Sequence, residues 1–287
     1  MTIRSALMKL VLQEDLNFLL TNRLPRRLAT KAVGRLARVE HAAVRVPSIA
    51  AWRFFSGVDL SDSAITRFRS LREAFIRPLK PGARAFDPDP AVIVSPCDAI
   101  VGAHGSIADG QVHQVKGFPY RLDELVPDAA LARRFEGGSF VTLRLTAGMY
   151  HRFHAPADLT VEAVTYLSGD CWNVNPIALK RVERLFCRNE RAVIEARLGD
   201  GTPMLLVPVA AILVASIRLT FLDTPALLRT RGPGRVACDA TLAKGAEMGW
   251  FEHGSTIIAI LPRGVALARG LVEGQPIRAG EPLAQHA

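Results

Sequence analysis

The chain lacks the features of a membrane-spanning or disulfide-stapled protein. No stretch reaches the roughly 20 consecutive apolar residues that cross a bilayer. The most apolar segment, residues 203–217, contains two prolines and is typical of buried strands. Only four cysteines occur in 287 residues, and none has CxxC spacing. This usage favours a reducing compartment and argues against a zinc site built from thiolates.

Motifs of several common enzyme classes are also missing or incomplete. There is no Walker-type phosphate loop, and residues 232–237 match a dinucleotide fingerprint only in part, because Pro233 stiffens the loop and no apolar strand precedes it. Residues 254–257 lack the second glycine of a nucleophile elbow. His151 and His154 are three residues apart, but no acidic third ligand is close in the sequence. We therefore expect no metal.

Positive charge is concentrated at the N-terminus. The formal net charge is +9, and residues 1–40 contain eight Lys/Arg against three acids. Such an excess binds either nucleic acid or anionic lipid. Within residues 26–39, apolar positions such as Leu28 and Leu36 alternate with Arg and Lys, which is typical of a helix lying in a bilayer interface. A DNA-binding helix would present more Asn, Gln and Ser. A solvated face of a helix docked on the protein remains an open alternative.

The periodicity of the apolar residues divides the chain into two regimes. Residues 1–80 show mainly helical spacing, including a predicted helix over 61–77 that begins with capping residues. From about Ala91 the spacing approaches two, in short β-branched runs separated by glycine turns. The sequence therefore predicts an α+β protein, with a helical membrane-associating segment (1–80) followed by a β-rich catalytic domain (81–287). No internal repeat is evident.

Three segments supply an Asp, a His and a Ser in that order. Asp98 ends Ser-Pro-Cys-Asp, His154 lies in Tyr-His-Arg-Phe-His, and Ser255 follows Gly254 directly. Alone, each would be an ordinary turn, core or strand-entry residue. Together they are the three side chains that a charge relay requires, in which a carboxylate orients an imidazole that deprotonates a hydroxyl. The Ser255 hydroxyl could also attack the carbonyl immediately before it.

Further motifs accompany these three in a fixed order. As a set they resemble the phosphatidylserine decarboxylases, over about residues 68–262. The additional matches are Phe-Ile-Arg-Pro-Leu at 75–79, Lys-Gly at 116–117 followed by Tyr-Arg-Leu at 120–122, Gly-Asp at 169–170, Asn-Val-Asn-Pro at 173–176, Arg-Asn-Glu-Arg at 188–191 and Lys-Gly-Ala-Glu-Met-Gly at 244–249.

The resemblance implies a self-processing enzyme. Asp98, His154 and Ser255 would cleave the chain between Gly254 and Ser255, giving a large chain (1–254) and a small chain (255–287). Ser255 would become a pyruvoyl group that forms a Schiff base with phosphatidylserine, releasing CO₂ and then phosphatidylethanolamine. The covalent pyruvoyl group would be the cofactor, with no metal and no PLP. The resemblance also suggests that His151 assists decarboxylation or protonation.

The same resemblance implies partners and a location. The partner would be phosphatidylserine in an anionic membrane, not nucleic acid, with the protein bound peripherally on the cytoplasmic face of a bacterial cell membrane. Its own two chains would form a heterodimer, and a higher oligomer is left open.

His253 stands where relatives usually have an apolar residue. This substitution could be inert, or it could alter maturation. A Ser-His-Asp hydrolase and a non-enzymatic basic module are the competing hypotheses.

Overall fold

An eight-stranded antiparallel sheet forms the centre of the computed structural model, which describes residues 13–19, 25–114, 118–212, 217–252 and 255–286. His253, Gly254 and the Lys-Gly pair at 116–117, on which parts of the sequence interpretation depend, lie outside these ranges. In spatial order the strands are β11 (Gly234–Leu242), β7 (Leu159–Leu167), β8 (Arg191–Leu198), β9 (Pro203–Ala210), β13 (Ser255–Leu261), β5 (Ser139–Leu145), β2 (Ala99–Ser106) and β15 (Pro276–Ile277).

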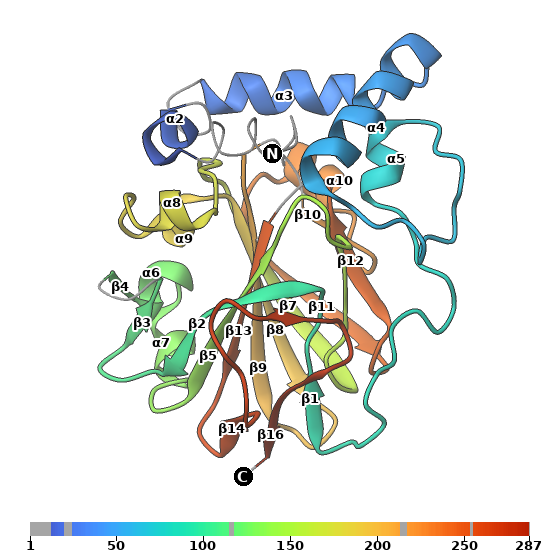
Figure 1. Cartoon of the computed structure of the whole chain (residues 1–287). Coiled ribbons are helices and arrows are strands. Elements are labelled where there is room, and N and C mark those ends of the chain that lie inside the picture. The colour runs from blue at the N-terminus through green and yellow to red at the C-terminus, as the bar shows by residue number, and fades with distance from the viewer. Residues whose placement is uncertain (1–12, 20–24, 115–117, 213–216, 253–254, 287) are drawn as a thin grey trace.

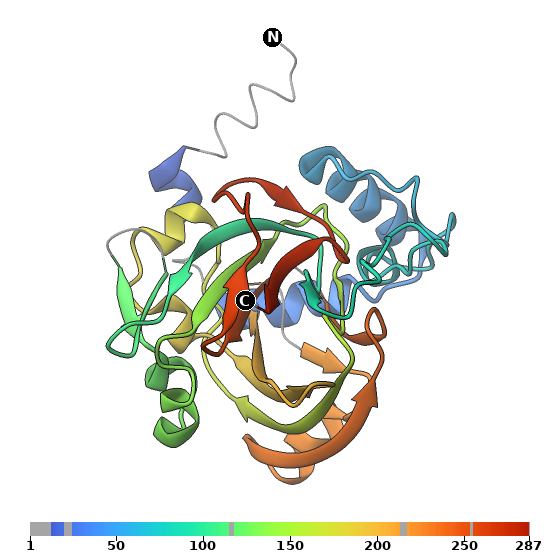
Figure 2. The ribbon, with the colours of Figure 1, turned by 90° about the horizontal axis from the view of Figure 1, so that it is seen from below.

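Two three-stranded sheets cover one face of this large sheet and enclose the main apolar core. The large sheet curves around that core when the molecule is seen from below (Figure 2). Alternating apolar residues of β13 and β5 point into it, including Ile257 and Leu143. The covering strands are β1 (Val92–Val94), β16 (Pro282–His286) and β14 (Val265–Leu267) in one sheet, and β10 (Ile217–Leu219), β12 (Glu247–Phe251) and β6 (Arg152–His154) in the other.

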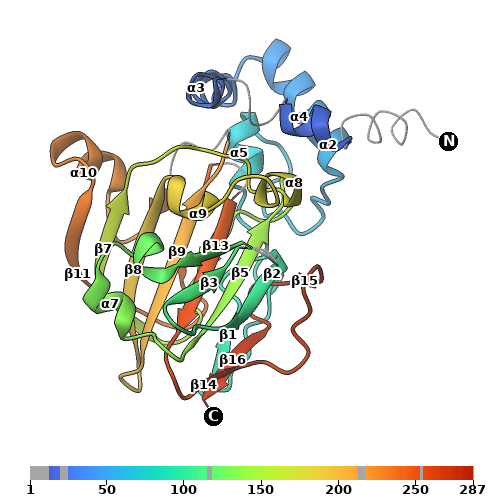
Figure 3. The ribbon, with the colours of Figure 1, turned by 90° about the vertical axis from the view of Figure 1, so that its left-hand side faces the viewer.

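Short helices and a hairpin cover the opposite face, where a second apolar cluster forms (Figure 3). Because both faces are covered, every residue of β13 is buried. The covering elements are β3 (Gln111–His113), β4 (Pro119–Arg121), α6 (Leu122–Leu125), α7 (Ala129–Arg133), α8 (Pro176–Leu179) and α9 (Leu185–Arg188), while α10 (Thr224–Thr230) connects β10 to β11.

The N-terminal helices lie across one end of the large sheet (Figure 1). They are α2 (Glu14–Phe18), α3 (Arg26–Leu36), α4 (Ala42–Ser56) and α5 (Leu71–Phe75). Helix α4 ends at Gly57, whose left-handed φ of 65° provides a C-terminal cap. Its Trp52 indole donates to the carbonyl of Ala147, just beyond β5, at 2.9 Å. No helix in the described ranges is long and apolar enough to cross a membrane.

The predicted α+β class is confirmed, with helices preceding a β-rich part. The predicted helix over 61–77 is wrong, because only Leu71–Phe75 is helical. The Ser63 hydroxyl instead donates to the Ile65 carbonyl and accepts from its amide, and Ser70 caps the helix. Serine side chains stabilise turns as readily as helix starts, so the pattern alone could not distinguish the two. The division at residue 80 stays a prediction.

Candidate active site

Ser255 is the first residue of β13, the strand at the centre of the large sheet. It pairs with Leu145 of β5 and with Ala210 of β9, and it is completely buried. Its hydroxyl has no hydrogen-bond partner among the described residues. A buried hydroxyl without a partner is costly and uncommon, and such groups are often kept for chemistry. The structure thus places the predicted nucleophile in a fixed strand with its hydroxyl unengaged by the residues described.

His154 is the last residue of β6, and both of its ring nitrogens are engaged. Nδ1 lies 2.8 Å from the carbonyl oxygen of Gly245, and Nε2 lies 3.0 Å from the Tyr150 hydroxyl. A carbonyl can only accept, so Nδ1 carries the proton and the Nε2 lone pair accepts from Tyr150. Burial lowers the pKa of the imidazole from its ordinary value of 6.5. The ring is therefore a neutral base with its lone pair on Nε2.

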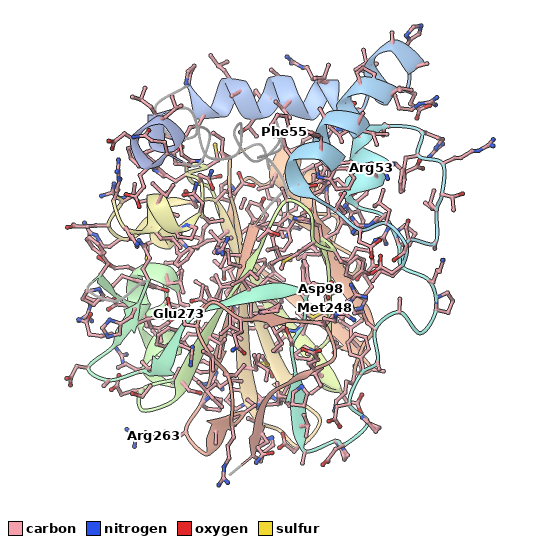
Figure 4. The ribbon with its side chains drawn as sticks, viewed as in Figure 1. Arg53, Phe55, Asp98, Met248, Arg263 and Glu273 are labelled. Carbon is pink, nitrogen blue, oxygen red and sulfur yellow. The ribbon has the colours of Figure 1, made fainter. Side chains whose placement is uncertain are left out.

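Asp98 lies just before β2, below the helical end of the molecule (Figure 4). Arg84 donates to both carboxylate oxygens, at 2.8 and 2.5 Å, and the amide of Ala279 donates to one of them at 3.0 Å. The carboxylate and His154 form no hydrogen bond with each other, although the negative charge of Asp98 does favour the protonated imidazole. Asp98 therefore acts on His154 only through its charge, and the carbonyl of Gly245 orients the imidazole. The charge-relay role of Asp98, His154 and Ser255 stays a prediction.

His151 is fully buried at the other end of the same motif. Its Nδ1 donates to the Met149 carbonyl at 2.8 Å. The imidazole packs against the Phe75 ring of α5, with ring centroids 4.0 Å apart, and Phe75 in turn contacts Trp52 of α4. His151 therefore connects the strand carrying His154 to the helices across the sheet end. Its role in decarboxylation is a prediction that these contacts leave untested.

A cavity of about 430 Å³ lies between the helices and the end of the large sheet. Leu145, which pairs with Ser255, lines it, as does Ala211, which follows the other partner of Ser255. Most of the described wall is apolar, and Arg144 is its one charged residue. The apolar side chains come from the N-terminal helices and from the segments next to the sheet end, and include Val33, Leu71, Phe75, Val174 and Ile212.

Glu252, three residues before Ser255, ties the helices to the sheet. Its carboxylate accepts from Arg72 at 2.8 and 3.1 Å and from Arg38 at 2.8 Å, with Arg218 3.5 Å away. Burial alone would raise its pKa, but the hydrogen bonds and charges of these arginines outweigh it and hold the pKa below 4.5. Arg72 belongs to α5 and Arg38 follows α3, so the helices are fixed next to the predicted cleavage site.

The residues described offer no group of three or more His, Cys, Asp or Glu side chains placed to hold a metal ion. Cys97, beside Asp98, is fully buried, and burial raises the pKa of its thiol well above 9.0. It is therefore a core residue, since the thiol stays protonated and unreactive.

Sequence reasoning missed Arg84, Tyr150 and Glu252 as contributors to this site. Tyr150 stands within the His154 motif, so its place in the matched segment was the available signal. Arg84 lies in a proline-rich connector and Glu252 in a strand end, where charged residues are ordinary. Only tertiary contacts distinguish them from solvated charges.

Comparison with known proteins matches most of the chain to one family. The family model described as phosphatidylserine decarboxylase matches residues 71–285. The chain is similar to a phosphatidylserine decarboxylase proenzyme of Shewanella baltica, at 36% identity over 84% of this chain and 85% of the relative. Proenzymes of the same description from Brevibacillus brevis (32% identity, 92% and 96% covered) and Photobacterium profundum (36% identity, 91% and 93% covered) are also similar.

The family match and the collinear relatives define a decarboxylase of the lyase class. The chain belongs to the phosphatidylserine decarboxylase family. The match begins at the first residue of α5 and ends one residue before the end of β16, so it includes all the described strands apart from His286.

The protonation state of His154 gives a first prediction. In an NMR titration of the imidazole, we expect half-protonation below pH 6.5, because burial favours the neutral ring. The stability that this neutral ring contributes is fully present above 6.5 and is lost as the pH falls through the lowered pKa. Tyr150→Phe should raise the pKa, since it removes a hydrogen bond to the neutral form. Titration at or above 6.5 in the unaltered chain would contradict this assignment.

The Glu252 cluster gives a second prediction. Glu252→Gln should lower the free energy of unfolding by about 1–3 kcal/mol, because it leaves three arginines without their shared carboxylate. The matched control is Glu162→Gln, which removes one exposed ion pair with Arg197 and should cost less than about 0.5 kcal/mol. Urea denaturation measures both changes. Equal, small losses would show that the cluster does not stabilise the docked helices.

Proposed function

We propose that this protein converts phosphatidylserine to phosphatidylethanolamine using a pyruvoyl group that it makes from Ser255 by cutting itself at Gly254–Ser255. The observation that carries the proposal is the placement of Ser255. It begins the central strand, its buried hydroxyl has no partner among the described residues, and both strands that flank it end at an apolar cavity. These features fit a residue that is converted into a cofactor beside a lipid site.

In the proposed self-cleavage, the Ser255 hydroxyl gives its proton to His154 and its oxygen attacks the carbonyl carbon of Gly254. The amide C–N bond breaks as the ester forms, and the freed amine of Ser255 takes the proton. Loss of the Cα proton then breaks the Cβ–Oγ bond, leaving a carboxylate on Gly254 and a dehydroalanine at 255. Addition of water and loss of ammonia give the pyruvoyl terminus. The products are chains 1–254 and 255–287, held together as a heterodimer.

The neighbours of His154 suit this role of base. The proton on Nδ1 is fixed by Gly245, which leaves Nε2 as the accepting atom. Tyr150 occupies that lone pair, so its hydroxyl must turn away or pass the proton on. Asp98, held by Arg84, contributes negative charge that favours the imidazolium formed during the step.

Decarboxylation needs an electron sink, and a pyruvoyl group supplies one for the electron pair left when CO₂ departs. The chain's own residues then exclude water and manage protons. Phe75 and Leu145 form apolar walls that favour loss of charge from the carboxylate. His151, buried against Phe75, is our candidate for delivering the proton to the carbon that loses CO₂.

We also propose that the N-terminal helices bring this cavity to a membrane surface. Exposed apolar side chains are concentrated on and next to them: Leu19, Leu28, Leu36, Val39, Val46, Phe54 and Phe55. Arg53 and Phe55 both belong to α4, at the helical end of the molecule (Figure 4). Apolar side chains among arginines suit an anionic bilayer interface. The proposed location is peripheral, on the cytoplasmic face of a bacterial membrane.

The covalent step gives a third prediction. The unaltered protein should separate into two masses, with the small chain beginning in pyruvoyl, and should release CO₂ from phosphatidylserine. Ser255→Ala should leave one intact chain without decarboxylase activity, because no hydroxyl remains to attack Gly254. The control is Ser139→Ala, which removes another buried hydroxyl without a described partner from the neighbouring strand β5. An intact, active wild-type chain would point instead to a hydrolase-like site and would overturn the proposal.

The helices give a fourth prediction. Replacing Phe54 and Phe55 together with Ser should weaken sedimentation with anionic liposomes by about tenfold, because two half-exposed rings are lost from the bilayer contact. Self-cleavage should continue at the unaltered rate. Val272→Ser, at a comparably exposed apolar position between β14 and β15, serves as control and should bind normally. Equal liposome binding by the double variant and the unaltered protein would show that Phe54 and Phe55 do not contribute to a membrane contact.

A further inference from the structure

We propose that Arg144, with the neighbouring hydroxyls of Thr142 and Thr256, binds the phosphodiester of the lipid substrate. This inference deepens the proposed function and rests on it. Arg144 lies near the end of β5 and faces the cavity beneath the helices. It forms no hydrogen bond or ion pair within the described residues, although it is partly buried.

The two buried arginines, Arg77 and Arg191, have compensating groups that the partly buried Arg144 lacks. Arg191 donates to four backbone carbonyls. Arg77 is more deeply buried and its Nε and Nη1 also lack a hydrogen-bond partner among the described residues, but the charges of Asp62 and Asp98 favour its protonated form. For Arg144, burial alone acts on the pKa and lowers it, with no nearby charge to oppose this. A partly desolvated cation without a counter-charge is unfavourable unless a ligand supplies the anion.

Two buried hydroxyls share the face of the sheet on which Arg144 lies. Thr256 is directly opposite Arg144 in the β13–β5 pairing, and Thr142 is two residues along the same strand. Side chains alternate across a strand, so all three lie on one face. Both hydroxyls are buried and have no partner among the described residues. One cation and two hydroxyl donors are a suitable set for phosphate oxygens.

Room for a ligand exists beside this group. Arg144 lines both the large cavity and a smaller one of about 120 Å³, and Thr142 lines the smaller one. Gly102 lines the smaller cavity together with Thr142. A side chain at Gly102 would narrow this cavity, because its Cβ would lie 3.3 Å from the Thr142 side chain. Glu273 also borders the smaller cavity, but it is exposed and does not pair with Arg144. Ser255 and Thr256 point to opposite faces of the sheet, but the large cavity reaches both faces at the strand ends, because Arg144 and Leu145, the strand partner of Ser255, both line it.

The reaction chemistry selects the phosphodiester over the carboxylate of the serine headgroup. The carboxylate must lose its charge as CO₂, so a strong ion pair with it would stabilise the ground state and slow the reaction. The phosphodiester keeps its charge throughout. Binding it contributes equally to the substrate and to the transition state, and such an interaction affects KM rather than kcat.

The test compares Arg144→Met with the unaltered enzyme on a short-chain, monomeric phosphatidylserine. We expect KM to rise about 10- to 100-fold, with kcat changed less than about twofold and self-cleavage unchanged. Arg144→Lys should recover part of the affinity. Arg197→Met, which removes an exposed cation paired with Glu162, should have no effect. An unchanged KM, or a fall in kcat alone, would overturn the inference.

A second arm uses a short-chain phosphatidylmethanol, which has the phosphodiester but no carboxylate. Its inhibition constant should rise in Arg144→Met by the same factor as KM. An unchanged inhibition constant would contradict the phosphodiester assignment.

The third arm needs no ligand. Arg144→Met should unfold at the same or a higher temperature than the unaltered protein, because it removes a desolvated charge. A lower melting temperature would show a structural partner and overturn the inference. A wild-type chain that neither cuts itself nor releases CO₂ would refute the proposed function. Equal KM in two active, cleaved enzymes would refute only the role of Arg144.

Discussion

The antiparallel pairing of β13 between β5 and β9 is the constraint on which the site depends. These pairings hold the residues of β13 in register, and the layers on the two faces of the sheet bury all of them. Because side chains alternate along a strand, Ser255 and Thr256 then point to opposite faces of the sheet. One face holds the core that includes Phe153 and Phe251, and the other carries Arg144. A shift of one residue would exchange the proposed nucleophile with its neighbour.

The helices across the sheet end supply the second part of the cavity wall. Their apolar residues close a cavity over the start of β13, and the Glu252–arginine cluster holds them there. The ion pairs are partly buried, so they couple the position of the helices to the segment just before Ser255. The same helices present exposed apolar side chains outward. One layer thus faces the proposed membrane on its outer side and the proposed lipid site on its inner side.

The acidic groups around the site are paired with arginines, whereas one arginine of the cavity is not paired with an acid among the described residues. Asp98 is matched by Arg84, Glu252 by several arginines, and His154 is kept neutral by burial. Arg144 alone faces the cavity without a counter-charge in the described structure. Since burying an unmatched charge is unfavourable, its place suits an anion brought by the substrate. The proposed charge relay and the proposed phosphate site therefore occupy opposite faces of one strand.

The sequence by itself determined the α+β class, a β-rich part from about residue 91 and the identity of Asp98, His154 and Ser255 as candidates, because alternation and ordered motifs are local properties of the chain. It predicted a helix over 61–77 that the structure reduces to Leu71–Phe75, since serine-rich caps and serine-rich turns look alike. Only the tertiary structure decided that Gly245 and Tyr150 engage His154, that Arg84 holds Asp98, and that Arg144 has no counter-charge. Those contacts join segments distant in sequence, and burial and charge pairing depend on neighbours that no local pattern records.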